Sequence, residues 1–440
     1  MKHFKAIFQK VINDFNQDKK NYFLNVIFIF LLISIPFSNF LNSSVIALFF
    51  LISLFRFNFI KEINATLILV IIFYLMMLFS WFWTIDKSLT LKSLVKEIPL
   101  LIIPICFILN KDIFRLNKSK ILKYYSYSIV LFSFYFILKA FYNFKLNNDI
   151  NVFFFHDLVT KELNAVHFSV FVSLALFYFL TKEFKKIKHY FFILFLLLFL
   201  FLLSSKNIIF STIFLSGIYF FYYSKSANKM RLRNIIISGI IFLSFFSFRL
   251  IKERLMFEFK IKGESNIGHT VINKKDVGSN VISMKEAWCN KKFNQTDYFS
   301  GSSFRVYQTR LFLDFLKEEK IFWTGFGLNA SYDKIEKKGI YYNVFQGNDE
   351  IEGYQKKNFH NQYIQVFAEL GVIGFVILII ILFINLKNAL KQKDFIHIAF
   401  AILMISLFLT ESFLWRQRGV VFFTAFYCLF NNTKRVKLNR

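Results

Sequence analysis

The amino-acid sequence predicts an all-α integral membrane protein with about 12 transmembrane helices and one large, partly helical loop on the outer side of the membrane. Of its 440 residues, 56% are hydrophobic and 66 are Phe, more than the interior of a water-soluble protein can bury. Apolar runs recur along the chain, and many approach the roughly 20 residues that a helix needs to cross a bilayer. These runs are continuous and do not alternate at every second residue, which favours helices over a β-barrel.

Twelve apolar runs follow one another along the chain. The predicted spans lie near residues 22–37, 40–57, 64–82, 94–109, 121–142, 164–181, 188–203, 207–224, 232–250, 360–386, 395–411 and 417–430. Several of these spans are short, so tilted helices or a locally thinner bilayer are expected. The first 20 residues are amphiphilic and lack a small-residue cleavage pattern, so no cleaved signal peptide is expected.

The distribution of Lys and Arg sets the orientation of these spans. The net charge is +28, and the cations gather in alternate connections, for example in residues 182–188 and 225–233, whereas the fourth outer connection carries only Lys206. Positive connections stay on the cytoplasmic side, so both termini are predicted to be cytoplasmic. The chain lacks zinc-finger, helix-turn-helix and RNA-binding signatures, so nucleic acid is not an expected partner.

The segment between the ninth and tenth spans divides the chain into three predicted parts. Residues 1–250 would hold spans 1 to 9, residues 251–359 the outer loop domain, and residues 360–440 spans 10 to 12 with a cytoplasmic tail. The loop is polar, mixed in charge and too long for a simple connection.

One amphipathic helix is expected inside the outer loop. Ser303 can cap it, and its apolar side chains Phe304, Tyr307, Leu311 and Phe315 would share one face. This face would lie against the membrane or the helix bundle. Residues 262–300 are predicted to be irregular.

The candidate functional residues gather at the outer ends of the spans. His360 and Asn361 begin the tenth span, Arg305 lies in the first turn of the loop helix, and Lys206 lies at the outer end of the eighth span. A cation in the first turn of a helix opposes the helix dipole, which is understandable if an anion such as phosphate binds there. Each residue also has a structural alternative, because His360 could serve only as a hydrogen-bonding cap and Lys206 only as a membrane anchor.

The last outer turn, ESFLWRQRG, holds a second group of candidates. Arg416 and Arg418 run against the rule that places cations on the inner side, and Glu411 accompanies them. His167 and His397 fall inside spans, where packing or internal hydrogen bonding is the preferred interpretation.

Several common catalytic patterns are missing from the sequence. No outer connection contains an Asp-x-Asp pair, and the chain has no P-loop, no serine-hydrolase elbow and no HExxH. The three cysteines are far apart in the sequence and suggest neither a disulfide framework nor a metal site. The sequence therefore predicts no metal and no cofactor.

Together these features resemble the O-antigen ligase and polymerase superfamily of bacterial envelope glycosyltransferases. The most specific match is HNQYIQVFAELGVIG, which starts at His360; Arg305, the GFG at residues 325–327 and SSKNIIFS around Lys206 occur in the order typical of the family. The resemblance covers about residues 200–420. Two positions depart from the family's pattern: Lys206 replaces an Arg, and Tyr307 replaces a Trp.

The resemblance implies a metal-independent glycosyltransferase of the bacterial inner membrane, with its active face in the periplasm. It would move a glycan from undecaprenyl pyrophosphate to lipid A–core or another glycan acceptor, among membrane lipids. By this resemblance His360 is the catalytic residue, and Arg305 binds the donor pyrophosphate. Lys206, Asn361 and Arg416 are further substrate-binding candidates, and Lys206 would keep the charge of the usual Arg without its two-pronged geometry.

Three other functions stay open at the level of sequence. An O-antigen polymerase would use the same donor with a polyprenyl-linked acceptor, and a pilin-type O-glycosyltransferase would modify a protein. A transporter of lipid-linked sugars would favour polar groups at the midplane of the membrane and matched broken helices in two repeats. The candidate residues lie at the outer ends of the spans instead.

Overall fold

The computed structural model describes residues 22–55, 64–160, 162–183, 185–223, 280–348 and 352–432. The predicted ninth span, residues 232–250, lies outside the described residues, as do the N-terminal segment, the beginning of the outer loop and the C-terminal tail. The described part is mostly helical, with two short strands, which confirms the all-α prediction.

Helices occupy the sites of the other eleven predicted spans. They are α2 (Tyr22–Ser34), α3 (Asn39–Phe55), α4 (Ala65–Phe79), α5 (Lys87–Glu97) with α6 (Pro99–Leu109), α7 (Lys111–Asn147), α9 (Ala165–Leu180), α10 (Ile187–Leu202), α11 (Lys206–Ile218), α16 (Gln362–Gln392), α17 (Phe395–Phe408) and α18 (Gln417–Asn431). Within the described ranges, three helices are long and apolar enough to cross a membrane: Ala65–Phe82, Lys118–Asn147 and Gln362–Gln392. The number of twelve spans therefore stays a prediction.

The predicted fourth span, 94–109, consists of two helices and not one. The side chain of Asp86 accepts a hydrogen bond from the backbone N–H of Leu89 and so caps α5. The second helix, α6, begins at Pro99, where the missing N–H costs little because the first turn of a helix leaves its N–H groups unpaired.

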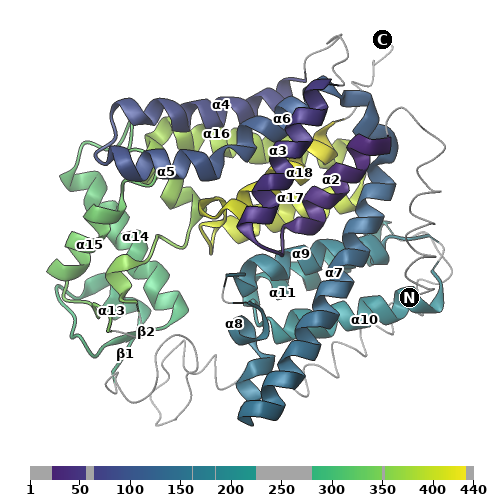
Figure 1. Cartoon of the computed structure of the whole chain (residues 1–440). Helices are drawn as coiled ribbons and strands as arrows, with labels where there is room; N and C mark the ends of the chain where they lie inside the picture. Colours follow the sequence, from purple (N-terminus) through teal and green to yellow (C-terminus); the bar gives the residue numbers. More distant parts are fainter. Residues whose placement is uncertain are drawn as a thin grey trace.

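Two helices, α9 and α18, form the centre of the bundle (Figure 1). All residues of α9 except Val166 are buried, and so are all residues of α18 except Gln417. The two helices meet directly, since the rings of Phe171 and Phe422 are stacked with centroids 4.4 Å apart. A helix that is apolar on every side belongs in such a buried position.

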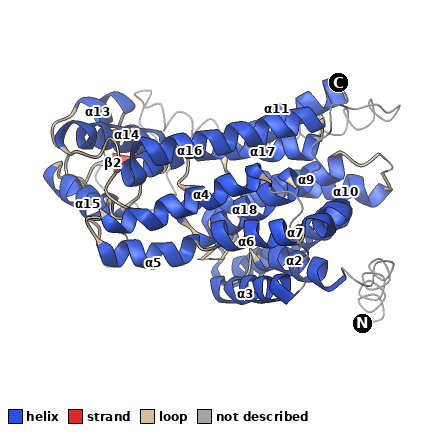
Figure 2. Cartoon of the chain, turned by 90° about the horizontal axis from the view of Figure 1, so that it is seen from above, coloured by secondary structure: helices blue, strands red, loops and turns tan. Residues whose placement is uncertain are grey.

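The described part of the predicted outer loop forms a body of its own at one end of the molecule (Figures 1 and 2). Its helices are α13 (Met284–Cys289), α14 (Gly301–Glu318) and α15 (Tyr332–Tyr341). Two short strands, β1 (Val281–Ile282) before α13 and β2 (Tyr298–Phe299) after it, pair with each other in parallel. A separate hydrophobic cluster unites these elements.

Two details of this loop differ from the sequence prediction. The cap of α14 is Ser300, whose side chain accepts a hydrogen bond from the backbone N–H of Ser303, so the helix begins earlier than predicted. Helix α13 lies within a region predicted to be irregular and starts with a capping box of Ser283 and Glu286. The predicted apolar face of α14 is buried, but mainly within the loop's own core.

Helix α16 is broken at Gly371, which has φ +67° and ψ −169°. The segment around Gly325 forms backbone hydrogen bonds with α16 on both sides of the break. Phe326 N–H donates to Ala368 O at 2.9 Å, and Val372 N–H donates to Phe322 O at 2.8 Å. A Cβ atom on Gly371 would lie 2.2 Å from the backbone of Trp323. This close approach docks the outer loop onto the helix that His360 precedes.

Candidate functional site

The turn that joins α17 to α18 is the centre of the candidate site. Helix α17 ends at Phe408, three residues before the predicted end of this span near residue 411, and Glu411 lies in the turn, as expected. Asn207 donates to Thr410 Oγ1 at 2.8 Å, Arg305 donates to Thr410 O, and Asn361 donates to Leu409 O at 3.2 Å. Segments that are far apart in the sequence, namely α11, α14 and the start of α16, therefore converge on one turn.

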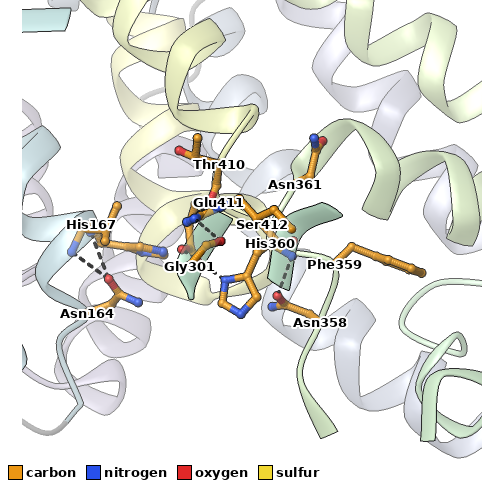
Figure 3. Close-up of polar contacts among 12 residues, drawn as sticks. Asn164, His167, Gly301, Asn358, Phe359, His360, Asn361, Thr410, Glu411 and Ser412 are labelled. Carbon is orange, nitrogen blue, oxygen red and sulfur yellow. Dashed lines mark hydrogen bonds and ion pairs between the residues drawn. The ribbon is translucent and has the colours of Figure 1, made fainter. Parts of the chain in front are cut away.

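His360 faces Glu411 across this turn (Figure 3). Its Nδ1 lies 3.6 Å from Glu411 Oε2, which is longer than a hydrogen bond. Catalytic hydrogen bonds are often long before substrate binds and shorten in the complex. The side chain of His360 is 30% exposed and that of Glu411 is 6% exposed, so the His reaches solvent and the carboxylate does not.

The backbone of His360 has an uncommon conformation for a residue with a side chain. Its φ is +46°, in the left-handed region that favours Gly. The side chain of Asn358 accepts a hydrogen bond from His360 N–H at 3.0 Å, and the ring of Phe304 packs edge-on against the imidazole at 5.7 Å. Strained residues held by their surroundings are typical of functional sites.

The carboxyl group of Glu411 is held ionised in spite of its burial. Burial by itself would raise its pKa, but His360, His167 and Arg305 offset this effect and lower the pKa to about 2 from its usual value near 4.5. An anion at this position can orient the imidazole of His360 and stabilise the imidazolium that forms when His360 accepts a proton.

Arg305 lies where the sequence placed it, in the first turns of α14, and it is anchored to the turn. Its Nε and one terminal nitrogen donate to Thr410 O at 3.0 and 2.8 Å, and the other terminal nitrogen donates to Gly301 O at 2.8 Å. The guanidinium therefore positions the residue before Glu411 and brings positive charge next to the site.

Lys206 is the first residue of α11, and its side chain is exposed. The next residue, Asn207, ties this helix end to the turn, because it also donates to Ser406 O at 2.7 Å. The helix end that carries Lys206 thus lies next to the turn that Arg305 contacts.

Asn361 acts mainly as the cap of α16. Its side-chain oxygen accepts hydrogen bonds from the backbone N–H groups of Tyr363 and Ile364, while its amide nitrogen reaches Leu409. Arg416 is exposed and lies on the other side of the turn, at the start of α18.

Sequence reasoning named Glu411 as part of the last outer turn but assigned it no role. It missed Thr410 and Gln365, whose side-chain oxygen accepts from Phe359 N–H and from Ser412 Oγ, both at 3.3 Å. The ELG of the matched motif offered a signal for Glu369, which is buried and accepts hydrogen bonds from Gln365 and Ser331. Glu369 therefore contacts the site only indirectly, through its hydrogen bond with Gln365.

Within the described ranges, no three His, Cys, Asp or Glu side chains lie close enough together to hold a metal ion. The chemistry that these residues offer is a solvent-facing imidazole, a buried carboxylate paired with it, and nearby cations. This combination can remove a proton from a hydroxyl group and stabilise an anionic leaving group.

Comparison with known families identifies part of the chain. Residues 191–379 match the family model described as O-antigen ligase, which confirms the resemblance inferred from the motifs. The match includes Lys206, Arg305 and His360, whereas Glu411 and Arg416 lie beyond it. None of the curated proteins matches the chain.

Proposed function

We propose that this membrane protein, whose residues 191–379 belong to the O-antigen ligase family, transfers a glycan from undecaprenyl pyrophosphate to lipid A–core on the periplasmic side of the inner membrane. The contact between His360 and Glu411 carries this proposal. It places the solvent-facing imidazole of His360, whose backbone is strained, next to a buried carboxylate at a turn that Arg305 binds.

The reaction would be a direct displacement at the anomeric carbon of the donor sugar. A hydroxyl oxygen of the acceptor forms a bond to this carbon while the bond to the pyrophosphate oxygen breaks. The hydroxyl proton passes to Nε2 of His360, because Nδ1 faces Glu411. The carboxylate then stabilises the imidazolium, as expected for a general base with an orienting partner.

The cations of the site would act on the leaving group. Undecaprenyl pyrophosphate departs with an additional negative charge, and Lys206 together with Arg305 would offset it. Arg305 keeps its role as the anchor of Thr410, so its contribution is mainly a fixed positive charge, whereas the exposed Lys206 can approach the phosphates directly. In this proposal no metal ion takes part.

The proposal can be tested with purified protein in lipid nanodiscs. We expect transfer from undecaprenyl pyrophosphate-linked glycan to lipid A–core, and we expect the rate to be unaffected by EDTA. Product formed only with a second lipid-linked glycan as acceptor would identify a polymerase, and loss of activity with EDTA would contradict the metal-free mechanism. A deletion strain supplies an independent readout, since uncapped lipid A–core should accumulate together with polymeric glycan on the lipid carrier.

A further inference from the structure

A cavity of about 260 Å³ lies beside the Glu411 turn, at the ends of α3, α5, α9 and α18. These are the helix ends that are predicted to face the outer side of the membrane. Its volume is near the lower end of the about 300–1,000 Å³ typical of small-molecule sites. The cavity is therefore large enough for one sugar unit or a phosphate group, but not for an entire oligosaccharide.

The wall of the cavity is positively charged. Lys96, Arg416 and Arg418 contribute cations, and Glu162 contributes an anion that pairs with Arg418 at 3.1 Å. Among the described residues, no ion pair engages Lys96 or Arg416. Both side chains are exposed, so two cations are left to meet a negatively charged ligand through charge-assisted contacts.

A buried polar atom without a partner gives a second, independent indication of a ligand. His167 lines the cavity and is 1% exposed, and its Nε2 has no hydrogen-bond partner among the described residues. Such an orphaned atom is rare in folded proteins and calls for a partner. The imidazole ring forms part of the cavity wall, so a small shift of the ring would bring Nε2 within reach of a hydroxyl or phosphate oxygen of a bound ligand.

The cavity also offers a fixed aromatic surface. Trp415 lines it, and its indole nitrogen donates to Asn329 Oδ1 at 2.6 Å, which fixes the orientation of the ring. The ammonium group of Lys96 lies 5.5 Å from the centre of this ring. A rigid ring with one apolar face beside cations suits a sugar that carries a negative charge.

The relation to Glu411 indicates which substrate the cavity serves. Figure 3 shows His167 and His360 on opposite sides of the Glu411 carboxylate, and both histidines act on it electrostatically. Arg305 and Asn207, the neighbour of Lys206, bind the turn at Thr410 and do not line the cavity. If these cations take the donor phosphates, the cavity is left for the acceptor.

We propose that this cavity binds one anionic sugar unit of the acceptor, a sugar that carries a phosphate or a carboxylate. This inference rests on the proposed function for the identity of the substrate, but not for binding itself. Lys96 and Arg416 bind the anionic group, Trp415 packs against the sugar ring, and His167 Nε2 forms a hydrogen bond to the ligand.

Binding can be measured without turnover, by the tryptophan fluorescence of the full chain in nanodiscs. Glucose 1-phosphate is the probe, with glucose and inorganic phosphate as comparisons. We expect a saturable signal with glucose 1-phosphate, a signal lost in Trp415→Phe, and affinity reduced roughly tenfold or more in the Lys96→Gln/Arg416→Gln double variant. Equal affinity of the double variant would overturn the inference, and equal binding of inorganic phosphate would overturn the sugar contact.

Kinetics separate the two substrates. Lys96→Gln should raise KM for the lipid A–core acceptor with kcat largely retained, and it should leave KM for the lipid-linked donor unchanged. A rise in the donor KM would contradict the assignment to the acceptor. Glucose 1-phosphate binding without any transfer would reject the proposed function but keep the cavity as a binding site, whereas normal transfer without binding would reject the cavity alone.

Discussion

Arg305 donates two hydrogen bonds to the carbonyl oxygen of Thr410, the residue immediately before Glu411. A guanidinium from the outer loop thereby fixes the turn that carries the buried carboxylate. The same turn binds Asn361, the neighbour of His360. The outer loop and two helix ends thus position the His360–Glu411 pair together.

We expect the change His360→Gly to separate stability from activity. Gly tolerates φ +46°, so relieved strain of up to about 1 kcal/mol should offset part of the stability that is lost with the imidazole contact to buried Glu411, and the variant should still fold. Transfer should fall by about 10²–10⁴-fold, the usual contribution of a general base. Thermal unfolding in detergent and the transfer assay measure both effects. Retained transfer would leave His360 with a structural role only.

Glu411→Gln should reduce transfer and also remove a pH-dependent part of the stability. The pKa of Glu411 is lower in the folded protein, about 2 against a usual 4.5, so its ionised form favours folding. This contribution is fully present above pH 4.5 and is lost as the pH falls towards 2. It corresponds to a stabilisation on the order of 2–4 kcal/mol at neutral pH. Unfolding temperatures recorded across this pH window should fall in the unmodified protein more steeply than in Glu411→Gln; parallel curves would contradict the assignment.

The charge of Lys206 should matter more than its shape. Lys206→Arg should keep substantial activity, whereas Lys206→Gln should lose roughly 10–100-fold, since a charge-assisted contact to phosphate is removed. The stability of Lys206→Gln should not fall, because a cation at the first position of α11 opposes the helix dipole. Equal transfer by the Gln variant, at equal protein levels, would leave only the role of a membrane anchor.

Gly371→Ala should destabilise the protein by about 3 kcal/mol or more. Its φ is +67°, and the new Cβ would lie 2.2 Å from backbone atoms of Trp323, which cannot move aside without displacing the docked loop. Gly217→Ala is the matched control, because nothing lies within 4 Å of its Cβ position in α11, and Ala stabilises a helix by up to about 1 kcal/mol over Gly. Similar unfolding temperatures for the two variants would contradict the close contact.

The orientation of the outer loop can be tested through Cys289. This thiol is exposed, whereas Cys106 and Cys428 are buried, so a membrane-impermeant thiol reagent should label one site. We expect labelling in intact spheroplasts, since the distribution of Lys and Arg predicts that the loop is periplasmic. Replacing Cys106 and Cys428 with Ala controls for incomplete burial. Labelling that requires lysis would reverse the predicted orientation.

The sequence predicted local features with short-range causes. Apolar runs become helices in the described ranges because a helix satisfies its own backbone hydrogen bonds wherever it lies. The predicted start of α14 was a few residues late, because Ser300 and Ser303 can each cap this helix and the sequence does not distinguish between them. The break at Gly371 was not predicted, because an isolated Gly in an apolar run does not by itself indicate that another segment will dock there.

The sequence alone predicted an all-α membrane protein, a resemblance to the O-antigen ligase superfamily that the family model matches over residues 191–379, and a candidate site with His360, Asn361, Arg305 and Lys206. Only the tertiary structure decided that His360 faces Glu411 and that Arg305 binds the carbonyl oxygen of the preceding residue, Thr410. The cationic cavity that His167 lines is likewise visible only in the tertiary structure. The physical reason is that helix formation depends on neighbours along the chain, whereas these contacts depend on how α11, α14, α16 and α17 pack. The buried state of Glu411, and hence its depressed pKa, likewise arises only when the turn is enclosed by its partners.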